Sequence, residues 1–230
     1  MSGRLYIVPT PVGNLEDMTF RAVRVLKEVD VILAEDTRTT EVLLKHYDIH
    51  TPMQSHHKFN EHETCRRWAE RVEAGEKVAL VSDAGTPGIS DPGFMLSREC
   101  RRLGVDVEGR PGATAFVPAL VASGLPCDRF VFEGFLPLKK RRATRLRELA
   151  EDPRSVIIYE SPLRLPRTLR QLAEAFGAER EAAVCREISK LHETINRDTI
   201  GNLADFYQLN QPKGEIVIVL CGNQRDRTHD

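Results

Sequence analysis

The chain has 230 residues, of which 41% are apolar and 29% are charged, and its net charge is −1. A chain of this length can form one large domain or two small ones with real hydrophobic cores, and its near-neutral charge excludes the globally basic profile of many nucleic-acid binders. No apolar run approaches the roughly 20 residues that span a membrane, and strand-like residues begin directly after Arg4, so we expect a cytoplasmic protein without a signal peptide.

The first half of the chain alternates short apolar strands with helical patterns. Between residues 19 and 29, for example, Phe20, Val23 and Leu26 recur near the 3.6-residue spacing of a helix. The order βαβα favours a parallel sheet that is covered by helices. Strands are predicted at 5–8, 31–34, 78–81 and 105–108, and helices from about 19, at 41–46, at 64–73 and in the segment that ends near 104.

Loops with proline, glycine or charged residues follow these strands, at 9–14, 35–38, 82–93 and 110–114. The loop 82–93 is the most informative, since it has three glycines and two prolines in twelve residues and offers oxygens from Asp83, Thr86 and Asp91. In a parallel sheet all four loops open at the carboxyl edge, where ligands bind, so we expect them to converge on one ligand. The alternative is that they hold only the turn residues that every βα connection needs, with Asp91 near a helix cap.

A second α/β series follows a junction at Gly124-Leu125-Pro126, where a helical segment over 113–123 ends. Its strands are predicted at 130–132, 156–159, 182–185 and 216–220, and its helices at 142–150 and 163–176. Two α/β domains of about one hundred residues each fit the usual domain size. We therefore predict an N-terminal α/β domain with the ligand loops over residues 1–118, a linker over 119–128, a C-terminal α/β domain over 129–222 and a polar tail over 223–230.

Several common cofactor and metal motifs are absent from the sequence. No two glycines are spaced as GxG and no Walker loop occurs, so nicotinamide and nucleoside-triphosphate chemistry have no support. The five cysteines are scattered and never spaced as CxxC, which indicates reduced thiols rather than a disulfide frame or a zinc site. Five histidines fall between residues 46 and 62, but HExxH is absent, so we predict no metal site and solvated or RNA-facing histidines.

The run Lys139-Lys140-Arg141-Arg142, continued by Arg145 and Arg147, is the dense cationic cluster of the chain. Phosphate oxygens are its natural partner, since each neutralised phosphate releases counterions and adds affinity that does not depend on base sequence. A solvated helix face is the alternative, because three acidic residues follow within 148–152.

Taken together, the chain resembles the small-subunit ribosomal RNA methyltransferases of the tetrapyrrole methylase superfamily, from Leu5 to Gly222. The resemblance is carried by LYIVPTPVGNL (5–15), AEDTR (34–38), SDAGTPGISDPG (82–93), PGATA (111–115), FEGFLP (132–137), YESP with Arg164 (159–164), Arg186-Glu187 with Lys190 and Glu193, and KGE (213–215). It implies a two-lobed tetrapyrrole-methylase-like α/β fold, with an N-terminal parallel sheet, a C-terminal mixed sheet and a ligand cleft between the lobes. It also implies S-adenosylmethionine as cofactor, the ribose 2′-hydroxyl of a cytidine in 16S rRNA of the small ribosomal subunit as acceptor, and a homodimer.

The resemblance further implies which residues form the site. Donor-binding residues are Pro11, Ser82, Asp83, Ala84, Gly85, Thr86 and Thr114 in the first lobe, and Leu136, Tyr159, Lys213, Gly214 and Glu215 in the second. A ribose hydroxyl is a poor nucleophile until it loses its proton, so the site needs a base or a cation that stabilises the alkoxide. Catalytic roles are expected first for Lys190 with Glu187 and second for Asp36. The alternative for Lys190, Glu187 and Glu193 is that their ion pairs only stabilise the second lobe. The expected RNA-binding residues are Arg38, His57, Asn60, Lys139, Lys140, Arg141, Arg142, Arg145 and Arg164.

One position departs from the pattern, since Arg110 stands before Pro111-Gly112 where the superfamily has an apolar residue, and its guanidinium is expected at solvent or RNA. Two other functions stay open: a methyltransferase of the same superfamily that acts on a tetrapyrrole or a protein, and a non-catalytic ribosome assembly factor. Against the tetrapyrrole enzymes stands PTPVGN (9–14) in place of their glycine-rich GxGPGD turn. Donor binding separates the assembly factor from an enzyme.

Overall fold

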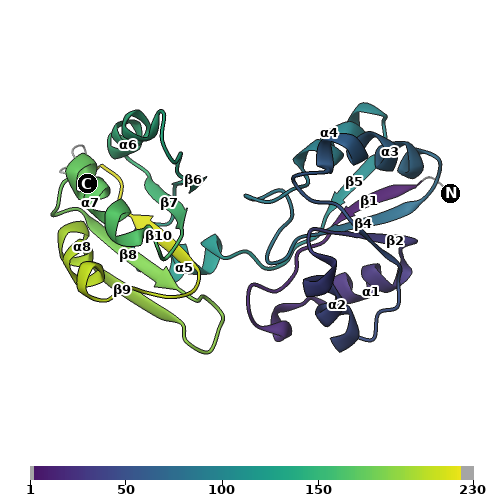
Figure 1. Cartoon of the computed structure of the whole chain (residues 1–230), viewed down its shortest axis with the longest axis horizontal. Helices are drawn as coiled ribbons and strands as arrows, with labels where there is room; N and C mark the ends of the chain where they lie inside the picture. Colours follow the sequence, from purple (N-terminus) through teal and green to yellow (C-terminus); the bar gives the residue numbers. More distant parts are fainter. Residues whose placement is uncertain (1–2, 224–230) are drawn as a thin grey trace. The chain divides into compact units, whose positions relative to one another are not determined.

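The computed structural model describes residues 3–223, and the chain divides after Thr114 into two compact units, each with a five-stranded sheet (Figure 1). Residues 224–230, which make up nearly all of the predicted polar tail 223–230, lie outside the described residues. Within 3–223, none of the helices combines the length and the apolar character needed to cross a bilayer.

The first unit contains a wholly parallel sheet with the strand order β3-β2-β4-β1-β5, so the predicted parallel α/β fold is confirmed. In the register of its centre, Leu5 lies opposite Val78 and Leu33 lies opposite Leu80. The elements are β1 (Arg4–Ile7), η1 (Leu15–Asp17), α1 (Phe20–Glu28), β2 (Val31–Ala34), α2 (Thr37–His46), β3 (Met53–Ser55), α3 (Glu61–Glu73), β4 (Lys77–Val81), α4 (Phe94–Arg102) and β5 (Asp106–Gly109).

Helices cover both faces of this sheet, which explains why its central strands are continuous apolar runs. On one face, Trp68 of α3 and Leu96 of α4 pack in one buried cluster with Leu80. On the other, Leu26 of α1 and Leu44 of α2 are buried with the opposite sides of the same strands (Figure 1). Since all five strands are parallel, the loops that follow them open at one carboxyl edge, and this positions the candidate site.

The second unit contains a mixed sheet with the order β6-β7-β10-β8-β9, in which β6 and β7 are parallel and the other pairs are antiparallel. Leu146, Leu169 and Leu203, from three different helices, share one buried cluster against this sheet. The elements are α5 (Phe116–Ala122), β6 (Phe130–Phe135), α6 (Arg142–Ala150), β7 (Ser155–Glu160), α7 (Leu165–Phe176), β8 (Glu181–Arg186), β9 (Thr194–Thr199), α8 (Ile200–Leu209) and β10 (Ile216–Leu220).

The segment 119–128, expected as a linker, belongs to the second unit. Ala119 and Leu120 lie on α5, and together with Leu125 they are buried in a cluster with Ile157 of β7 and Val217 of β10. The change of unit falls after Thr114, before this helix. Burial of these apolar side chains explains the difference, because a helix that covers part of a sheet is not a free connection.

Candidate functional site

Three of the predicted ligand loops are joined at the carboxyl edge of the first sheet. The backbones of Thr10 and Gly85 exchange two hydrogen bonds of 2.9 Å each, and the hydroxyl of Thr10 donates to the carbonyl of Ser82 at 3.0 Å. The hydroxyl of Thr86 donates to the carbonyl of Ala113 at 3.0 Å. The loops that follow β1, β4 and β5 therefore meet, as the sequence predicts.

The loop after β2 joins them through a reciprocal contact. The backbone N–H of Asp36 donates to Oδ1 of Asp83 at 3.0 Å, and the backbone N–H of Asp83 donates to the carboxylate of Glu35. Burial raises the pKa of the Glu35 carboxyl, and the nearby charge of Asp83 raises it further. Sequence reasoning included Glu35 in a matching segment but gave it no role; its place as the residue directly after a buried strand was the available signal.

Asp36 and Arg38 form a local ion pair at the start of α2. Asp36 caps this helix by accepting the N–H of Arg38 at 2.9 Å, and it accepts two further bonds from the guanidinium at 3.0 and 2.6 Å. These bonds lower the pKa of Asp36 to about 2. Asp36 is therefore a weak proton acceptor at neutral pH, whereas the side chain of Arg38 stays 89% exposed.

A hollow of about 570 Å³ lies at this edge. Apolar and oxygen-bearing groups share its wall, and the Oγ1 of Thr40 is buried there without a hydrogen-bond partner among the described residues. A buried hydroxyl without a partner is costly unless a ligand or water satisfies it. The lining residues are Thr10, Pro11, Gly13, Leu15, Asp36, Arg38, Thr39, Thr40, Val42, Leu43, Ser82 and Asp83.

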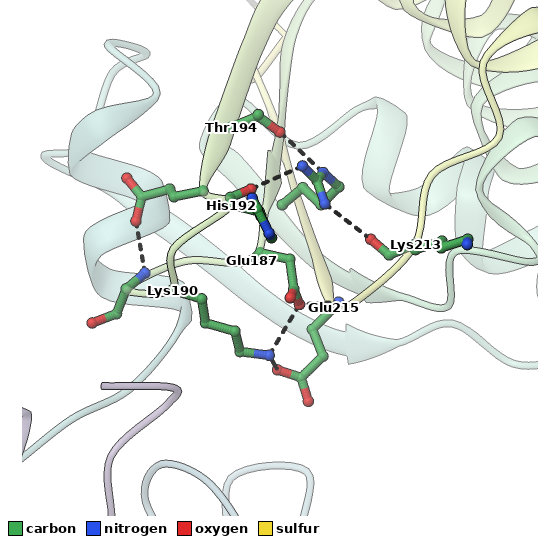
Figure 2. A network of polar contacts seen from close by, with 9 residues as sticks. Glu187, Lys190, His192, Thr194, Lys213 and Glu215 are labelled. Carbon is green, nitrogen blue, oxygen red and sulfur yellow. Dashed lines mark hydrogen bonds and ion pairs between the residues drawn. The ribbon is translucent and has the colours of Figure 1, made fainter. Parts of the chain in front are cut away.

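In the second unit, Lys190 lies between two carboxylates (Figure 2). Its ammonium is 3.0 Å from Oε1 of Glu187 and 2.8 Å from Oε2 of Glu215, and the backbone N–H of Glu215 donates to Glu187 at 2.8 Å. The structure thus brings together Lys190 and Glu187, which were expected to be catalytic, with Glu215, which was expected to bind the donor. Glu193 makes a different contact, since its carboxylate accepts the N–H of Ser189 at 2.6 Å within the same loop.

The charges of this cluster stabilise one another. Burial disfavours the charged form of Lys190, but the hydrogen bonds from its ammonium to Glu215 and Glu187 outweigh that cost and raise its pKa. Burial likewise acts to raise the pKa of Glu187, but the N–H of Glu215 and the Lys190 ammonium outweigh it and hold that pKa below its ordinary range. At neutral pH the Lys190 ammonium is therefore protonated and the Glu187 carboxyl is ionised.

Gly214 makes this cluster sterically possible. Its φ is +89°, and a Cβ added there would overlap the carboxyl group of Glu187. The preceding carbonyl of Lys213 accepts from the guanidinium of Arg186 at 3.3 Å, which fixes the segment to the end of β8. The KGE segment therefore holds Glu187 through the backbone N–H of Glu215 and holds Lys190 through the Glu215 carboxylate.

The other donor-binding residues expected in the second unit differ in accessibility. Tyr159 is partly exposed, and its ring lies 5.1 Å from that of Phe132 and 5.7 Å from that of Phe135. Leu136 is buried in the hydrophobic core with α6 and α7, so its side chain packs inside the unit and its backbone is the part available to a ligand.

One residue of the basic run that was expected to bind RNA, Arg142, lies in the interior of the second unit. Arg142 is buried, and its guanidinium donates to Gln171 at 2.8 Å, to the Pro137 carbonyl at 3.1 Å and to Thr168 at 2.7 Å. It also lies 3.6 Å from the carboxylate of Glu160, which is buried. The expectation that Arg142 faces RNA was therefore wrong, because the spacing of the run places it on the buried side of α6.

The remaining cations fall into two sets. Arg145 forms two bonds to Glu133, at 2.9 and 2.6 Å, and Arg164 is 2.7 Å from Glu160, so both are engaged within the unit. Lys139, Lys140 and Arg141 are exposed, and so is Arg147.

Two side chains of the first unit that were expected at solvent or RNA, those of Asn60 and Arg110, are also engaged internally. Asn60 accepts from the N–H of His57 at 2.8 Å and donates to the Ser55 carbonyl at 3.2 Å, so its side chain builds a turn. Arg110 is ion-paired with Glu108 and lies over the ring of Tyr6, 5.0 Å from its centroid. The expectation of a solvent- or RNA-facing Arg110 is thus corrected, since packing on an aromatic face holds it against the sheet.

Known families account for nearly the whole chain. Residues 4–204 match the family model of Tetrapyrrole (Corrin/Porphyrin) Methylases. The ribosomal RNA small subunit methyltransferase I of Pseudomonas aeruginosa is 47% identical over 97% of this chain and 80% of its own length. The protein of the same name from Thermotoga maritima is 45% identical over 96% of this chain and 100% of its own length.

Solved structures agree on the fold. A cobalt precorrin-4 methyltransferase of cobalamin biosynthesis has a TM-score of 0.69 at 19% identity, over 95% of this chain and 94% of its own. A diphthine synthase has a TM-score of 0.73 at 15% identity, over 95% of this chain and 90% of its own. At these identities the likeness concerns the fold alone.

Proposed function

Since the chain belongs to the tetrapyrrole methylase family, and within it to the ribosomal RNA small subunit methyltransferase I group, it is a methyltransferase, and we propose that it methylates the ribose 2′-hydroxyl of a cytidine in 16S rRNA with S-adenosylmethionine as donor. The observation that carries the proposal is the sequence identity of 45–47% to proteins of that name, over 96–97% of this chain. The joined loops at the carboxyl edge support it, because they are the segments that the resemblance assigns to the donor.

The residues of the first unit fit such a donor. S-adenosylmethionine, when bound, supplies an electrophilic methyl group on a positively charged sulfur. Asp83 offers a carboxylate to the positive charges of the donor, Pro11 and the other apolar residues of the hollow offer cover for the adenine, and the orphan Oγ1 of Thr40 offers a hydrogen bond. We propose donor contacts for Pro11, Ser82, Asp83, Ala84, Gly85, Thr86 and Thr114, and in the second unit for the Leu136 backbone, Tyr159, Lys213, Gly214 and Glu215.

The acceptor oxygen needs help to become a nucleophile. In the transfer, a carbon–oxygen bond forms as the carbon–sulfur bond breaks, and the hydroxyl proton passes to a base. We assign to Lys190 the stabilisation of the developing negative charge on oxygen, with Glu187 as a positioning residue that holds the ammonium. In the first unit, Glu35 is a better proton acceptor than Asp36, because its pKa is raised while that of Asp36 is about 2.

The RNA surface is proposed at the exposed cations Lys139, Lys140, Arg141 and Arg147, together with Arg38. Phosphate binding by these side chains would not require a basic protein overall. We further propose that the protein is a homodimer, since a second copy would double this cationic surface. We also propose a cytoplasmic location.

Donor binding by the purified protein tests the first half of the proposal. Titration calorimetry with S-adenosylmethionine is expected to detect one site. Asp83→Asn is expected to weaken donor binding about 10-fold to about 150-fold, since hydrogen bonds to charged groups contribute about 1.5–3 kcal/mol. Asparagine still accepts the N–H of Asp36, so the loop contact survives the change. Asp205→Asn, at an exposed position of α8, is the matched control. Absence of donor binding by the folded wild-type protein would instead favour the assembly-factor function.

A further inference from the structure

A turn between β3 and α3 presents an aromatic ring to solvent. The side chain of Phe59 is 81% exposed, although full burial of a phenylalanine would contribute about 1.5–3 kcal/mol. A charged neighbour accompanies it, since the ammonium of Lys58 lies 5.0 Å from the centroid of this ring. The imidazole of His57 approaches the ring edge-on, at a centroid distance of 5.9 Å.

This turn, residues 56–61, is held in one shape by its own polar groups. Besides the two bonds of the Asn60 amide, the N–H of Phe59 donates to Nδ1 of His57 at 3.2 Å. The neighbouring His56 is fully buried, and its Nδ1 lies 3.0 Å from the hydroxyl of Thr64. Phe59 is therefore projected from a preorganised turn, which lowers the entropy cost of a contact made through its ring.

The turn is also tied to the loop expected to bind the donor. Glu61 is buried, and its carboxylate accepts the N–H of Gly93 at 2.9 Å and that of Met95 at 3.3 Å, where the loop 82–93 enters α4. The charge of Lys58 acts on the carboxyl of Glu35, which the N–H of Asp83 also contacts. The ring of Phe59 thus belongs to the same sheet edge as the donor loop.

We propose that Phe59 stacks on an unpaired base of the acceptor RNA and that Lys58 binds an adjacent phosphate. An aromatic face offers stacking to any base, and a neighbouring ammonium suits the backbone of a single strand. This inference rests on the proposed function, because it places the acceptor RNA at the edge of the first sheet. A protein partner would use the same exposed ring without the phosphate-binding lysine, and it is one outcome of the test.

Steady-state methyl transfer to small ribosomal subunits measures the role of the ring. Phe59→Ala is expected to lower kcat/KM by about 5-fold to about 150-fold, since stacking on an aromatic side chain contributes about 1–3 kcal/mol per base. Phe59→Trp is expected to retain activity, and the affinity for S-adenosylmethionine to stay unchanged in both variants. Leu209→Ala, which removes a side chain that is 86% exposed at the end of α8, is the control. If the wild type is active and Phe59→Ala has the same kcat/KM, the inference is overturned.

A binding measurement separates this inference from the proposed function. Trp68 is fully buried, so the wild-type protein titrated in parallel gives the background, and the added emission of Phe59→Trp reports on the exposed ring. Titration with a single-stranded oligocytidylate is expected to quench this added emission. Lys58→Ala is expected to lower the slope of the logarithm of the binding constant against the logarithm of the salt concentration by about one. Quenching without methyl transfer by the wild type would leave the stacking intact and contradict the proposed function. No quenching, or a Phe59→Ala variant that changes only the oligomeric state, would refute the stacking.

Discussion

Lys190 is the residue on which the proposed chemistry depends most. Its ammonium is held by Glu187 and Glu215, so it has a fixed position and stays protonated at neutral pH. Lys190→Ala is expected to lower kcat by about 100-fold or more, the usual loss when a group that stabilises a developing oxyanion is removed, while donor affinity changes little. Single-turnover methyl transfer and titration calorimetry measure the two effects separately. If the alanine variant keeps its turnover, the lysine only stabilises the second unit.

The pKa of Asp36 gives a test of the first unit. A carboxyl whose folded pKa is about 2, against an ordinary 3.8, stabilises the fold above about pH 4 and loses that contribution as the pH falls toward 2. Because the side-chain bonds from Arg38 are the first cause of the shift, Arg38→Ala is expected to raise the Asp36 pKa toward 3.8. NMR titration of the carboxyl carbon measures it. An unchanged pKa in the variant would mean that the ion pair does not form in solution.

Arg142 is assigned to the interior rather than to RNA. Arg142→Ala leaves the Glu160 carboxylate buried with one cationic partner fewer, which is expected to cost about 3 kcal/mol of unfolding free energy. Arg147→Ala, an exposed change on the same helix, is expected to stay within about 0.5 kcal/mol of the wild type. Urea unfolding compares the two. Similar unfolding free energies for the two variants would contradict the buried position of Arg142 and favour its expected role in RNA binding.

At the scale of elements, the turn before β10 determines the geometry of the Lys190 cluster. Gly214→Ala is expected to displace Glu187 and to reduce turnover nearly as much as Lys190→Ala, because the added methyl overlaps the Glu187 carboxyl. Gly177→Ala is the matched control, since Gly177 has a similar φ of +93° but no atom near the added Cβ. Each change strains the backbone by about 1–2 kcal/mol. Comparison of kcat between the two variants therefore isolates the clash, and equal values would contradict it.

Elements with one dominant pattern could be predicted from the sequence. The strand Val31–Ala34 is found at its predicted residues, since it is buried throughout and bounded by charged residues. The short strand β3 was not predicted, because three residues give no periodicity. The strand β9, with sequence TINRDT, was also missed, since it is a largely polar edge strand that pairs with β8 alone. Its existence depends on a partner far along the chain, which local sequence does not reveal.

The candidate site could be predicted by location but only partly by role. The carboxyl-edge loops follow from the strand order, and they meet as expected. Which cations are free does not follow from the sequence, because it depends on the side of α6 that packs: Arg142 is buried, while Arg147 is exposed. The pairing of Lys190 with Glu215 is likewise a product of the fold, since it joins the loop after β8 to the start of β10.

The whole molecule is a methyltransferase with two α/β units, each with its own buried core. Proteins named for tetrapyrrole, diphthine and ribosomal RNA chemistry have this fold, so the fold itself does not fix the substrate. The acceptor is the feature that distinguishes the proposed function from methylation of a tetrapyrrole or a protein.

The proposed acceptor is tested by methyl transfer from labelled S-adenosylmethionine to small ribosomal subunits from cells that lack this protein. Digestion of the RNA to nucleosides identifies the labelled product. Label is expected in 2′-O-methylcytidine, and the Lys190→Ala variant is expected to transfer it about 100-fold more slowly than the wild type, or more slowly still. Label in a protein or in another nucleoside, or no transfer by a folded protein that binds the donor, would contradict the proposed acceptor.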